Sequence, residues 1–307
     1  MSLPKFSKKK NLLRLIEMSK RYLDDYLIEK GLLVITSVLV MLIFLLLIFV
    51  LIEAIPAFYE NGVLNFIFGL EWSADNNQFG IFPMIVGSVY VTLIALVMAV
   101  PISISCAIFL EDIASDNLRN VFKPIIQTLA GIPSVIYGFF GLTLIAPIIR
   151  NVFGGSGLSI LTAAIVLALM ILPTIISLAQ DAIRSVPDYY REASWGLGSN
   201  QWQCIKNVVI PIALPGIITA IILGLGRAIG ETLAVLMLAG NVSVFPSSII
   251  SPVRTLTSNI ALEMGYATGI HYNSLFATAL ILFAIILVLM MISTHFQNRY
   301  ALKGVMS

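Results

Sequence analysis

Six apolar segments limit what this chain can fold into. A helix needs about 20 mostly apolar residues to cross a hydrocarbon core about 30 Å thick, and each segment reaches this length. The sequence therefore predicts an all-α, polytopic membrane protein with six transmembrane helices. The composition agrees, because only 11% of the residues are charged, against about 25% in soluble domains. The segments are residues 32–52, 84–109, 125–149, 159–179, 212–239 and 275–294.

Lysine and arginine are unequally divided between the two sides of these segments. Fifteen lie in the N-terminal segment, in the connections after the second and fourth apolar segments, and in the C-terminal tail, whereas the opposite side has only Arg150 and Arg254. Basic loops remain on the cytoplasmic side. The distribution predicts a multi-pass protein of the cell (inner or plasma) membrane with both termini in the cytoplasm. The remaining cation, Arg227, lies within the fifth apolar segment.

These assignments divide the chain into five parts. We expect a cytoplasmic N-terminal tail (1–30), a first transmembrane helix (31–53), an extracytoplasmic loop (54–83), a core of five helices (84–296) and a cytoplasmic C-terminal tail (297–307). The first helix is too long for a cleavable signal peptide and follows a polar segment. Two interpretations of the N-terminal tail are open. It is a flexible topogenic tail, or a membrane-surface helix whose lipid-facing residues are Leu12, Leu13, Leu15 and Ile16.

The connection between the fourth and fifth apolar segments, residues 185–210, is predicted to form two short helices around a glycine turn. Ser185 and Asp188 have the spacing of a capping box, and the helix that follows is expected to stop at Gly196–Gly198. Asn200 and Gln203 have the same spacing. We expect them to open a second helix, which Pro211 ends at the membrane.

Four aromatic residues in this connection have two possible roles. Aromatic side chains are enriched where proteins dock on one another, and also where a chain is anchored at the lipid interface. Both interpretations are open from the residues alone, which are Tyr189, Tyr190, Trp195 and Trp202.

The same connection resembles the EAA loop of ABC importer permeases. Glu192-Ala193-Ser194, then Gly198, then Val208-Val209-Ile210-Pro211 keep that motif's spacing, with Ser194 in place of its second alanine. The resemblance implies that residues 185–210 form the coupling helix, which sits in a groove of a separate ATPase. It also implies that Glu192, Ala193 and Gly198 serve this coupling.

Three further segments, 129–141, 223–235 and 251–265, resemble phosphate-specific ABC importer permeases. Segment 251–265, taken together with the long charged N-terminus of the chain, is closer to the PstC-like permease than to its PstA-like sister. The resemblance implies a subunit of an ATP-driven phosphate importer that pairs with a PstA-like permease. Its other implied partners are a PstB-like ATPase dimer on the cytoplasmic face and an extracytoplasmic, PstS-like phosphate-binding protein.

The sequence does not predict an enzyme. It contains no Gly-Lys dipeptide and hence no phosphate-cradling P-loop, so ATP and Mg²⁺ are expected to bind the partner ATPase, with no cofactor in this chain. The two histidines, His271 and His295, lie near membrane boundaries, and no catalytic set can be assembled around them. Cys106 and Cys204 have no metal-binding spacing and do not read as a disulfide. We expect no catalytic or metal site.

Two opposite charges, Arg227 and Glu231, lie within the apolar stretch LGLGRAIGETLAV. With 3.6 residues per turn, a continuous helix would place both within a sector of about 80°. Small residues at such spacing allow another helix to approach closely. We therefore expect the charges to face protein rather than lipid, on a face shared with Gly216, Ala220, Gly224 and Ala234.

The functional interpretation of this pair is an anion site on a substrate pathway. A guanidinium presents a planar fork that matches two phosphate oxygens, and Glu231 would weaken binding enough to permit release. Two hydroxyls complete the predicted pathway: Thr232, which follows Glu231, and Ser134, which lies in the third apolar segment. This third segment is rich in glycine and is expected to be interrupted or closely packed. The alternatives are an i,i+4 salt bridge or a lock between helices, and for Ser134 a local bond to its own helix.

Two alternative functions are open. One is an ion-coupled secondary transporter, and the other is an ABC permease for phosphonate, sulfate or molybdate.

Loop 240–274 is expected to face outward and to contact the binding protein, with a short helix at Ser258–Met264 and with Asn259 and Glu263 reachable from its surface. The alternative role for this loop is a passive lid over the pore.

Overall fold

The computed structural model describes the backbone of residues 6–305 and the side chains of Tyr26 and residues 28–295. The side chains proposed to contact lipid in the N-terminal tail lie outside these described residues. The chain divides into two compact units that meet at Ile52 and Glu53. The N-terminal unit is a single helix, the greater part of α1 (Phe6–Asn61).

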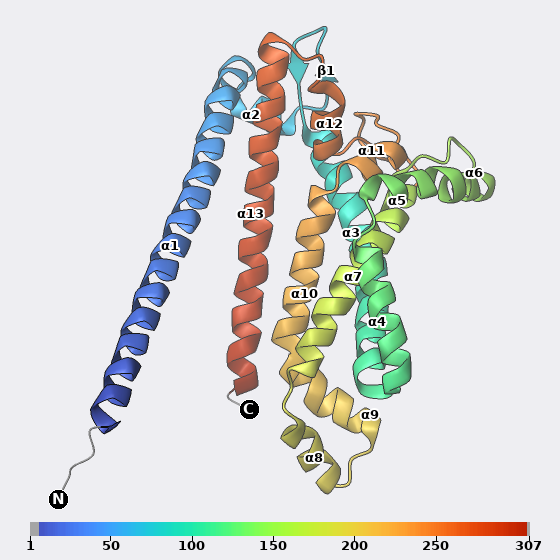
Figure 1. The fold of residues 1–307 in the computed structure, drawn as a ribbon. Helices are drawn as coiled ribbons and strands as arrows, with labels where there is room; N and C mark the ends of the chain where they lie inside the picture. Colours follow the sequence, from blue (N-terminus) through green and yellow to red (C-terminus); the bar gives the residue numbers. More distant parts are fainter. Residues whose placement is uncertain (1–5, 306–307) are drawn as a thin grey trace, which may run out of the picture. The chain divides into compact units, whose positions relative to one another are not determined.

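Six helices of the described chain are long and apolar enough to cross a membrane, which confirms the predicted number. Their bounds are wider than the apolar segments, because polar residues extend several of the helices (Figure 1). They are Ile28–Asn61, Phe82–Ile113, Ser134–Phe153, Ile160–Arg184, Gln201–Gly230 and Gly269–His295.

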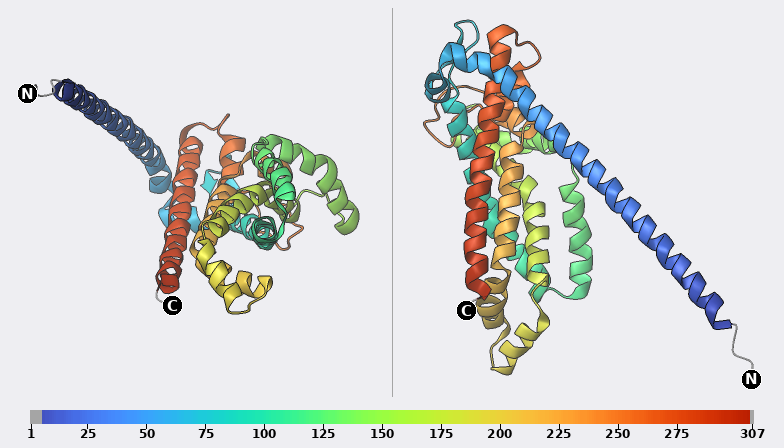
Figure 2. Two further views of the ribbon diagram at one scale, coloured as in Figure 1. Left: turned by 60° about the horizontal axis from the view of Figure 1, so that its bottom comes forward. Right: turned by 90° about the vertical axis from the view of Figure 1, so that its left-hand side faces the viewer.

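The core of the second unit is built around α7 (Ile160–Arg184). This helix packs against α3 (Phe82–Ile108) and α10 (Ile210–Gly230), and it is the most buried of the six. On the other face of α10 lies α13 (Gly269–Val305), as Figure 2 shows in its right-hand view. Small residues make the approach close: a Cβ added at Gly216 of α10 would lie 2.5 Å from the Cβ of Ala182 on α7.

The third apolar segment is interrupted, and the span predicted at 125–149 starts too early. Helix α4 (Asp116–Ala130) ends at Gly131, and a new helical segment begins at Ser134. The cause is Pro133, which biases Ile132 away from helical backbone angles. The predicted interruption is thereby confirmed. The new segment consists of α5 (Ser134–Phe140), a π-helical turn η2 (Gly141–Ile145) and α6 (Ala146–Phe153), which crosses the direction of α7 (Figure 1).

One end of the second unit, the hairpin end (residues 62–81 and 239–268), carries short elements. They are α2 (Val63–Phe68), the antiparallel strands β1 (Trp72–Ser73) and β2 (Gln78–Phe79), and α12 (Leu256–Glu263). The strands lie in a loop for which the sequence predicted no structure, whereas α12 corresponds to the short helix expected at Ser258–Met264.

A buried polar network holds the hairpin end together around Glu263. Its carboxylate accepts hydrogen bonds from Trp72 Nε1 at 2.7 Å and pairs with Arg254 Nη1 at 2.5 Å and His271 Nε2 at 2.8 Å. Glu263 is 6% exposed and Asn259 is 0% exposed. The expectation that these two side chains are reachable from the surface is therefore wrong. Glu263 is internal because Trp72 of β1, 191 positions earlier in the chain, packs against it together with the nearby Arg254 and His271, and Asn259 accepts a hydrogen bond from the same arginine.

The close contact between α10 and α7 generates a stability prediction. Gly216→Val should lower the free energy of unfolding of the isolated chain by about 1–3 kcal/mol, the usual cost of overpacking. Gly226→Val is the matched control, because a Cβ there meets nothing within 4 Å and both changes place a β-branched residue in the same helix. Thermal unfolding in detergent measures the difference. Equal melting temperatures for the two variants would contradict the packing described.

Candidate functional site

Arg227 lies in the last turn of α10, beside the stripe of small residues that packs on α7. In this chain alone its side chain is exposed. Its Nη1 donates a hydrogen bond of 3.3 Å to Thr174 Oγ1 on α7. A second hydroxyl of this region, Tyr137 on α5, donates to Leu129 O at 3.0 Å. Arg227 forms no ion pair with another described residue.

The continuous helix assumed for Arg227 and Glu231 is wrong. Helix α10 ends at Gly230, and Glu231 has extended backbone angles, with φ −67° and ψ 129°. Instead of pairing with Arg227, its Oε1 accepts a hydrogen bond of 3.1 Å from Ala234 N, in the first turn of α11 (Leu233–Leu238). A carboxylate stabilises the free amides at a helix start. The helix therefore ends at Gly230, because glycine weakens α10 there and the Glu231 side chain stabilises the start of α11.

Ala234 is also not on the face predicted for it, because it belongs to α11 and packs against α5. A Cβ at Gly138 of α5 would lie 2.7 Å from Met237 Sδ and 3.2 Å from Ala234 Cα. A Cβ at Gly141 would lie 2.7 Å from the side chain of Leu238. This contact between two short helices confirms the close packing predicted for the third segment.

The same contacts show that α5 and α11 run in the same direction, since later residues of one meet later residues of the other. Ser134 begins α5 and Thr232 immediately precedes α11, so these two predicted residues lie at the same end of the helix pair. Thr232 Oγ1 donates to Gly230 O at 3.2 Å. Ser134 Oγ makes no hydrogen bond to the described chain, so the local bond considered for it does not form.

Two residues of this region were missed from the sequence. Thr174 follows Pro173 in the fourth apolar segment, and Tyr137 stands among apolar neighbours. A threonine or tyrosine in a membrane helix carries no signal of its own, because both are ordinary at helix contacts and interfaces. The approach of α7 to the end of α10 identifies Thr174, and the packing of α5 on α11 identifies Tyr137.

A second cluster of predicted residues lies at the opposite end of the second unit, the elbow end (residues 109–119 and 184–205). Helix α8 (Asp188–Gly196) is followed by Gly198 with φ +86° and by α9 (Gln201–Cys204). The capping box of Asn200 and Gln203 is formed by both reciprocal hydrogen bonds. The two-helix elbow and its glycine turn are thus confirmed.

Two details of the elbow differ from the prediction. Ser185 and Asp188 form no capping box: Ser185 ends α7, where its Oγ donates to Ala182 O at 2.7 Å, and Pro187 precedes α8. Pro211 does not end the second helix, because the chain continues through the π-helical turn η3 (Ile205–Val209) into α10. A π-turn changes the hydrogen-bonding register, and Pro211 follows it in the first turn of α10, where proline is tolerated.

The predicted coupling residues are accessible. Glu192, Ala193 and Gly198 are exposed, whereas Ser194 is buried and its Oγ lies 2.5 Å from Ser199 Oγ. This leaves one face of the elbow free of contacts within the described chain. The aromatic side chains that enlarge its exposed surface are Tyr189, Tyr190, Trp195 and Trp202.

The two tyrosines of this surface are in direct contact. Their ring centroids are 4.2 Å apart, and a side-chain hydrogen bond with Tyr190 raises the pKa of the Tyr189 phenol above its ordinary value. The two rings therefore form one continuous aromatic patch on the exposed surface of the elbow.

Comparisons with known proteins agree on one family. A family model described as a binding-protein-dependent transport system inner membrane component matches residues 99–302. The probable ABC transporter permease protein YqgH of Bacillus subtilis (strain 168) is similar, with 39% identity over 82% of this chain and 84% of its own length. The phosphate transport system permease protein PstC of Pasteurella multocida (strain Pm70) is 36% identical over 75% of this chain and 78% of its own length.

Solved structures show the same fold. A chain of a bacterial ABC transporter involved in import of the acidic polysaccharide alginate aligns with a TM-score of 0.63 at 17% identity, covering 93% of this chain and 99% of that chain. A chain of the inward-facing MetNI methionine ABC transporter aligns with a TM-score of 0.55 at 18% identity, covering 72% and 94%.

The break at Gly230 generates a prediction about Arg227 and Glu231. Their effects on the stability of the isolated chain should be additive, because groups without shared contacts add within about 0.5 kcal/mol. A double-mutant cycle tests this: thermal unfolding measures the stability of Arg227→Leu, Glu231→Leu and the double variant. A coupling energy above about 1 kcal/mol, in the range found for residues in contact, would indicate that the two side chains form a salt bridge and would contradict the geometry.

Proposed function

Because this chain belongs to the family of binding-protein-dependent transport system inner membrane components, we propose that it is a permease subunit of an ATP-driven importer of inorganic phosphate. It forms the translocation pathway together with a sister permease. The observation that carries the substrate assignment is Arg227, a guanidinium inside an apolar segment with a hydroxyl as its described partner. The relatives named for phosphate transport support the same substrate.

Arg227 binds the anion during transit in this proposal. A charged side chain within a membrane-spanning helix is costly, so an intramembrane arginine is a candidate functional residue. The guanidinium offers two parallel N–H groups to two phosphate oxygens. The bond to Thr174 is a single one of 3.3 Å to a neutral hydroxyl, and it is readily exchanged for the two stronger bonds to an anion.

The other polar groups near the end of α10 complete the pathway. Thr232 and Ser134 lie at the same end of the helix pair α5 and α11, and their hydroxyls can donate to phosphate oxygens. Glu231 caps α11 and keeps a negative charge near the path, which prevents the anion from binding too tightly to leave. Binding and release are thereby both served by fixed groups of the chain.

The two ends of the second unit face opposite sides of the membrane in this proposal. The excess of basic residues at the elbow end and in both tails supports a cytoplasmic position for these parts. There Glu192, Ala193 and Gly198 dock on an ATPase dimer, which binds ATP and Mg²⁺ and performs the hydrolysis. The hairpin end faces outward and receives the phosphate-binding protein. Exposed loop residues suited to this contact are Val244, Phe245, Ile249 and Ile250.

The proposed function is tested by reconstitution. Vesicles that contain this chain, its sister permease and the ATPase should accumulate phosphate when ATP and the loaded binding protein are supplied. Omission of any one component should abolish uptake. Uptake driven by an ion gradient without ATP would instead indicate a secondary transporter, and uptake of sulfate or molybdate in preference to phosphate would change the substrate.

Substitutions at Arg227 test the anion site. The double variant Arg227→Leu with Glu231→Leu should fold, insert and assemble yet carry no phosphate. Arg227→Lys should also be impaired, because lysine keeps the charge and loses the planar fork. Phosphate uptake, normalised to assembled complex, measures both effects. Uptake by the double variant at the unmodified rate would show that these charges are not needed for transport.

Substitutions in the elbow test its coupling role. Gly198→Val should strain the turn, because a β-branched residue does not tolerate φ +86°, and Glu192→Lys should place the wrong charge on the docking face. We expect both to reach the membrane and to lose stimulation of ATP hydrolysis by the loaded binding protein. Gly198→Asn is the control, since asparagine adopts positive φ at little cost. Normal stimulation in the first two variants would refute the docking assignment.

A further inference from the structure

Two adjacent carboxylates at the elbow end are buried and point to different partners. Glu111 and Asp112 lie in η1 (Phe109–Ile113), a π-helical turn that ends α3, and each side chain is 8% exposed. Buried carboxylates are costly unless they are paired, and π-turns within helices occur frequently at functional positions. Neither residue has a part in the anion pathway or on the docking face described above.

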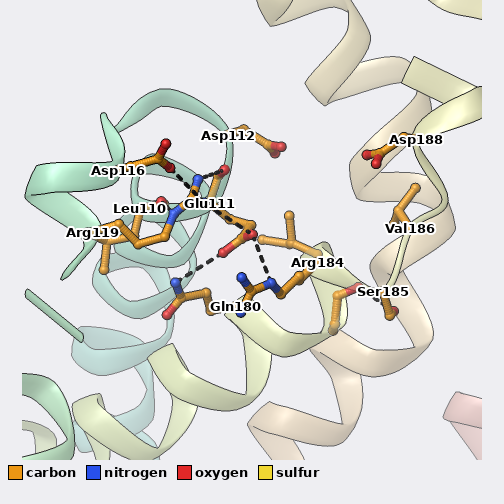
Figure 3. Close-up of polar contacts among 12 residues, drawn as sticks. Leu110, Glu111, Asp112, Asp116, Arg119, Gln180, Arg184, Ser185, Val186 and Asp188 are labelled. Carbon is orange, nitrogen blue, oxygen red and sulfur yellow. Dashed lines mark hydrogen bonds and ion pairs between the residues drawn. The ribbon is translucent and has the colours of Figure 1, made fainter. Parts of the chain in front are cut away.

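Glu111 holds α3 to α7 and α4. Its Oε2 accepts a hydrogen bond of 3.1 Å from Gln180 Nε2, and its Oε1 lies 3.6 Å from Arg184 Nε, with both partners on α7 (Figure 3). Arg119 of α4 completes the contact: its Nη1 lies 3.9 Å from Oε1, and its Nη2 donates to Glu111 O at 2.6 Å. Three helices are joined at this carboxylate.

Asp112 holds the elbow to the same turn. Its Oδ1 accepts a hydrogen bond of 2.8 Å from Arg191 Nη2 on α8, and its backbone carbonyl accepts one of 2.5 Å from Gln201 Nε2 on α9. Arg191 also donates from Nη1 to Val186 O at 2.9 Å, which fixes its guanidinium against the end of α7. The Arg191 and Asp112 side chains are 13% and 8% exposed, so solvent weakens this pair little.

The two carboxylates therefore form a continuous connection from the docking helix to the pathway. Helix α8 packs on α9 and η3, which belong to the same elbow, and its ion pair with Asp112 ties it to α3. Glu111 then ties α3 to Gln180 and Arg184 of α7. The same helix carries Thr174, the hydrogen-bond partner of Arg227.

We infer that the Asp112–Arg191 ion pair is the link through which movement of α8 on the ATPase reaches α3 and α7, with Glu111 distributing that movement between them. Asp112 is a positioning residue, since it acts through other groups and touches neither phosphate nor ATP. The inference rests on the proposed function. It adds a specific coupling route behind the exposed docking residues.

The experiment measures phosphate transported per ATP hydrolysed in vesicles with the complete transporter. Asp112→Asn keeps the size of the side chain and removes the charge that holds Arg191. We expect normal assembly and normal ATP hydrolysis in the absence of the binding protein, with the ratio of phosphate transported to ATP hydrolysed lowered about tenfold, the size of a typical coupling between two sites. Asp112→Glu, which keeps the charge, should recover much of the ratio.

The matched control is Asp116→Asn, the same chemical change four residues away. Asp116 is 90% exposed and pairs with Arg119 at 3.6 Å, so its loss should leave the ratio unchanged. Arg191→Gln should reproduce the effect of Asp112→Asn, and the double variant should be no worse than either, because the link is already broken. A purely structural role would lower the amount of assembled complex and leave the ratio unchanged.

The outcomes separate this inference from the proposed function. An unmodified transporter that moves no phosphate in response to ATP contradicts the proposed function itself. An unmodified transporter that does so, with an unchanged ratio in Asp112→Asn and Arg191→Gln, overturns only the link. Failure of both variants to assemble would make the ion pair an element of folding and would equally overturn its role in coupling.

Discussion

The close packing of α10 and α3 on α7 is the contact on which the second unit depends. No hydrophobic force drives helices together within lipid, so small residues that allow close approach must supply the contact. Gly216 and Gly224 of α10 meet Ala182 and Ile175 of α7 at distances that leave no space for a side chain. Helix α7 contributes to both the proposed anion site and the carboxylate cluster at the elbow end. It carries Thr174, which bonds to Arg227, and Gln180, which bonds to Glu111.

Two breaks in apolar segments position the polar groups of the proposed pathway. Irregular backbone at membrane depth is tolerated only where protein or a water-filled cavity covers it. The breaks at Gly131–Pro133 and Gly230–Thr232 lead into α5 and α11, which pack directly on one another. The absence of a side chain at Gly138 of α5 allows this close contact. Ser134 and Thr232 lie at one end of this helix pair.

Much of the architecture is predictable from the sequence because it depends on local patterns. Apolar length gives the six helices, and the Asn200–Gln203 spacing gives the second elbow helix with its cap. The break at Gly230 was missed because a continuous period was assumed through a stretch whose apolar character does not change. The stop comes from Gly230 and from a Glu231 side chain that caps the next helix, and the apolar pattern indicates neither.

Residues held by distant partners are beyond such reasoning. Glu263 appears as an ordinary loop residue until Trp72, 191 positions away, donates a hydrogen bond to its carboxylate. Glu111 and Asp112 likewise resemble a solvated acidic pair at a helix end. Their burial depends on residues up to 89 positions later in the chain. Tertiary contacts of this kind leave no periodic or motif signal in a single sequence.

The pairing of charges distinguishes structural cations from the one assigned to transport. Arginines at the two ends of the second unit are matched with buried carboxylates: Arg119 and Arg184 with Glu111, Arg191 with Asp112, and Arg254 with Glu263. Removing one member of such a pair leaves the other charge buried without a partner, which is strongly destabilising. These contacts therefore hold the fold together. Arg227 has a threonine hydroxyl in place of a carboxylate, although it lies in a membrane-spanning helix, where charged side chains are costly. Because no carboxylate of the described chain neutralises it, Arg227 is free to bind a mobile anion, and this is the property that the proposed anion pathway requires.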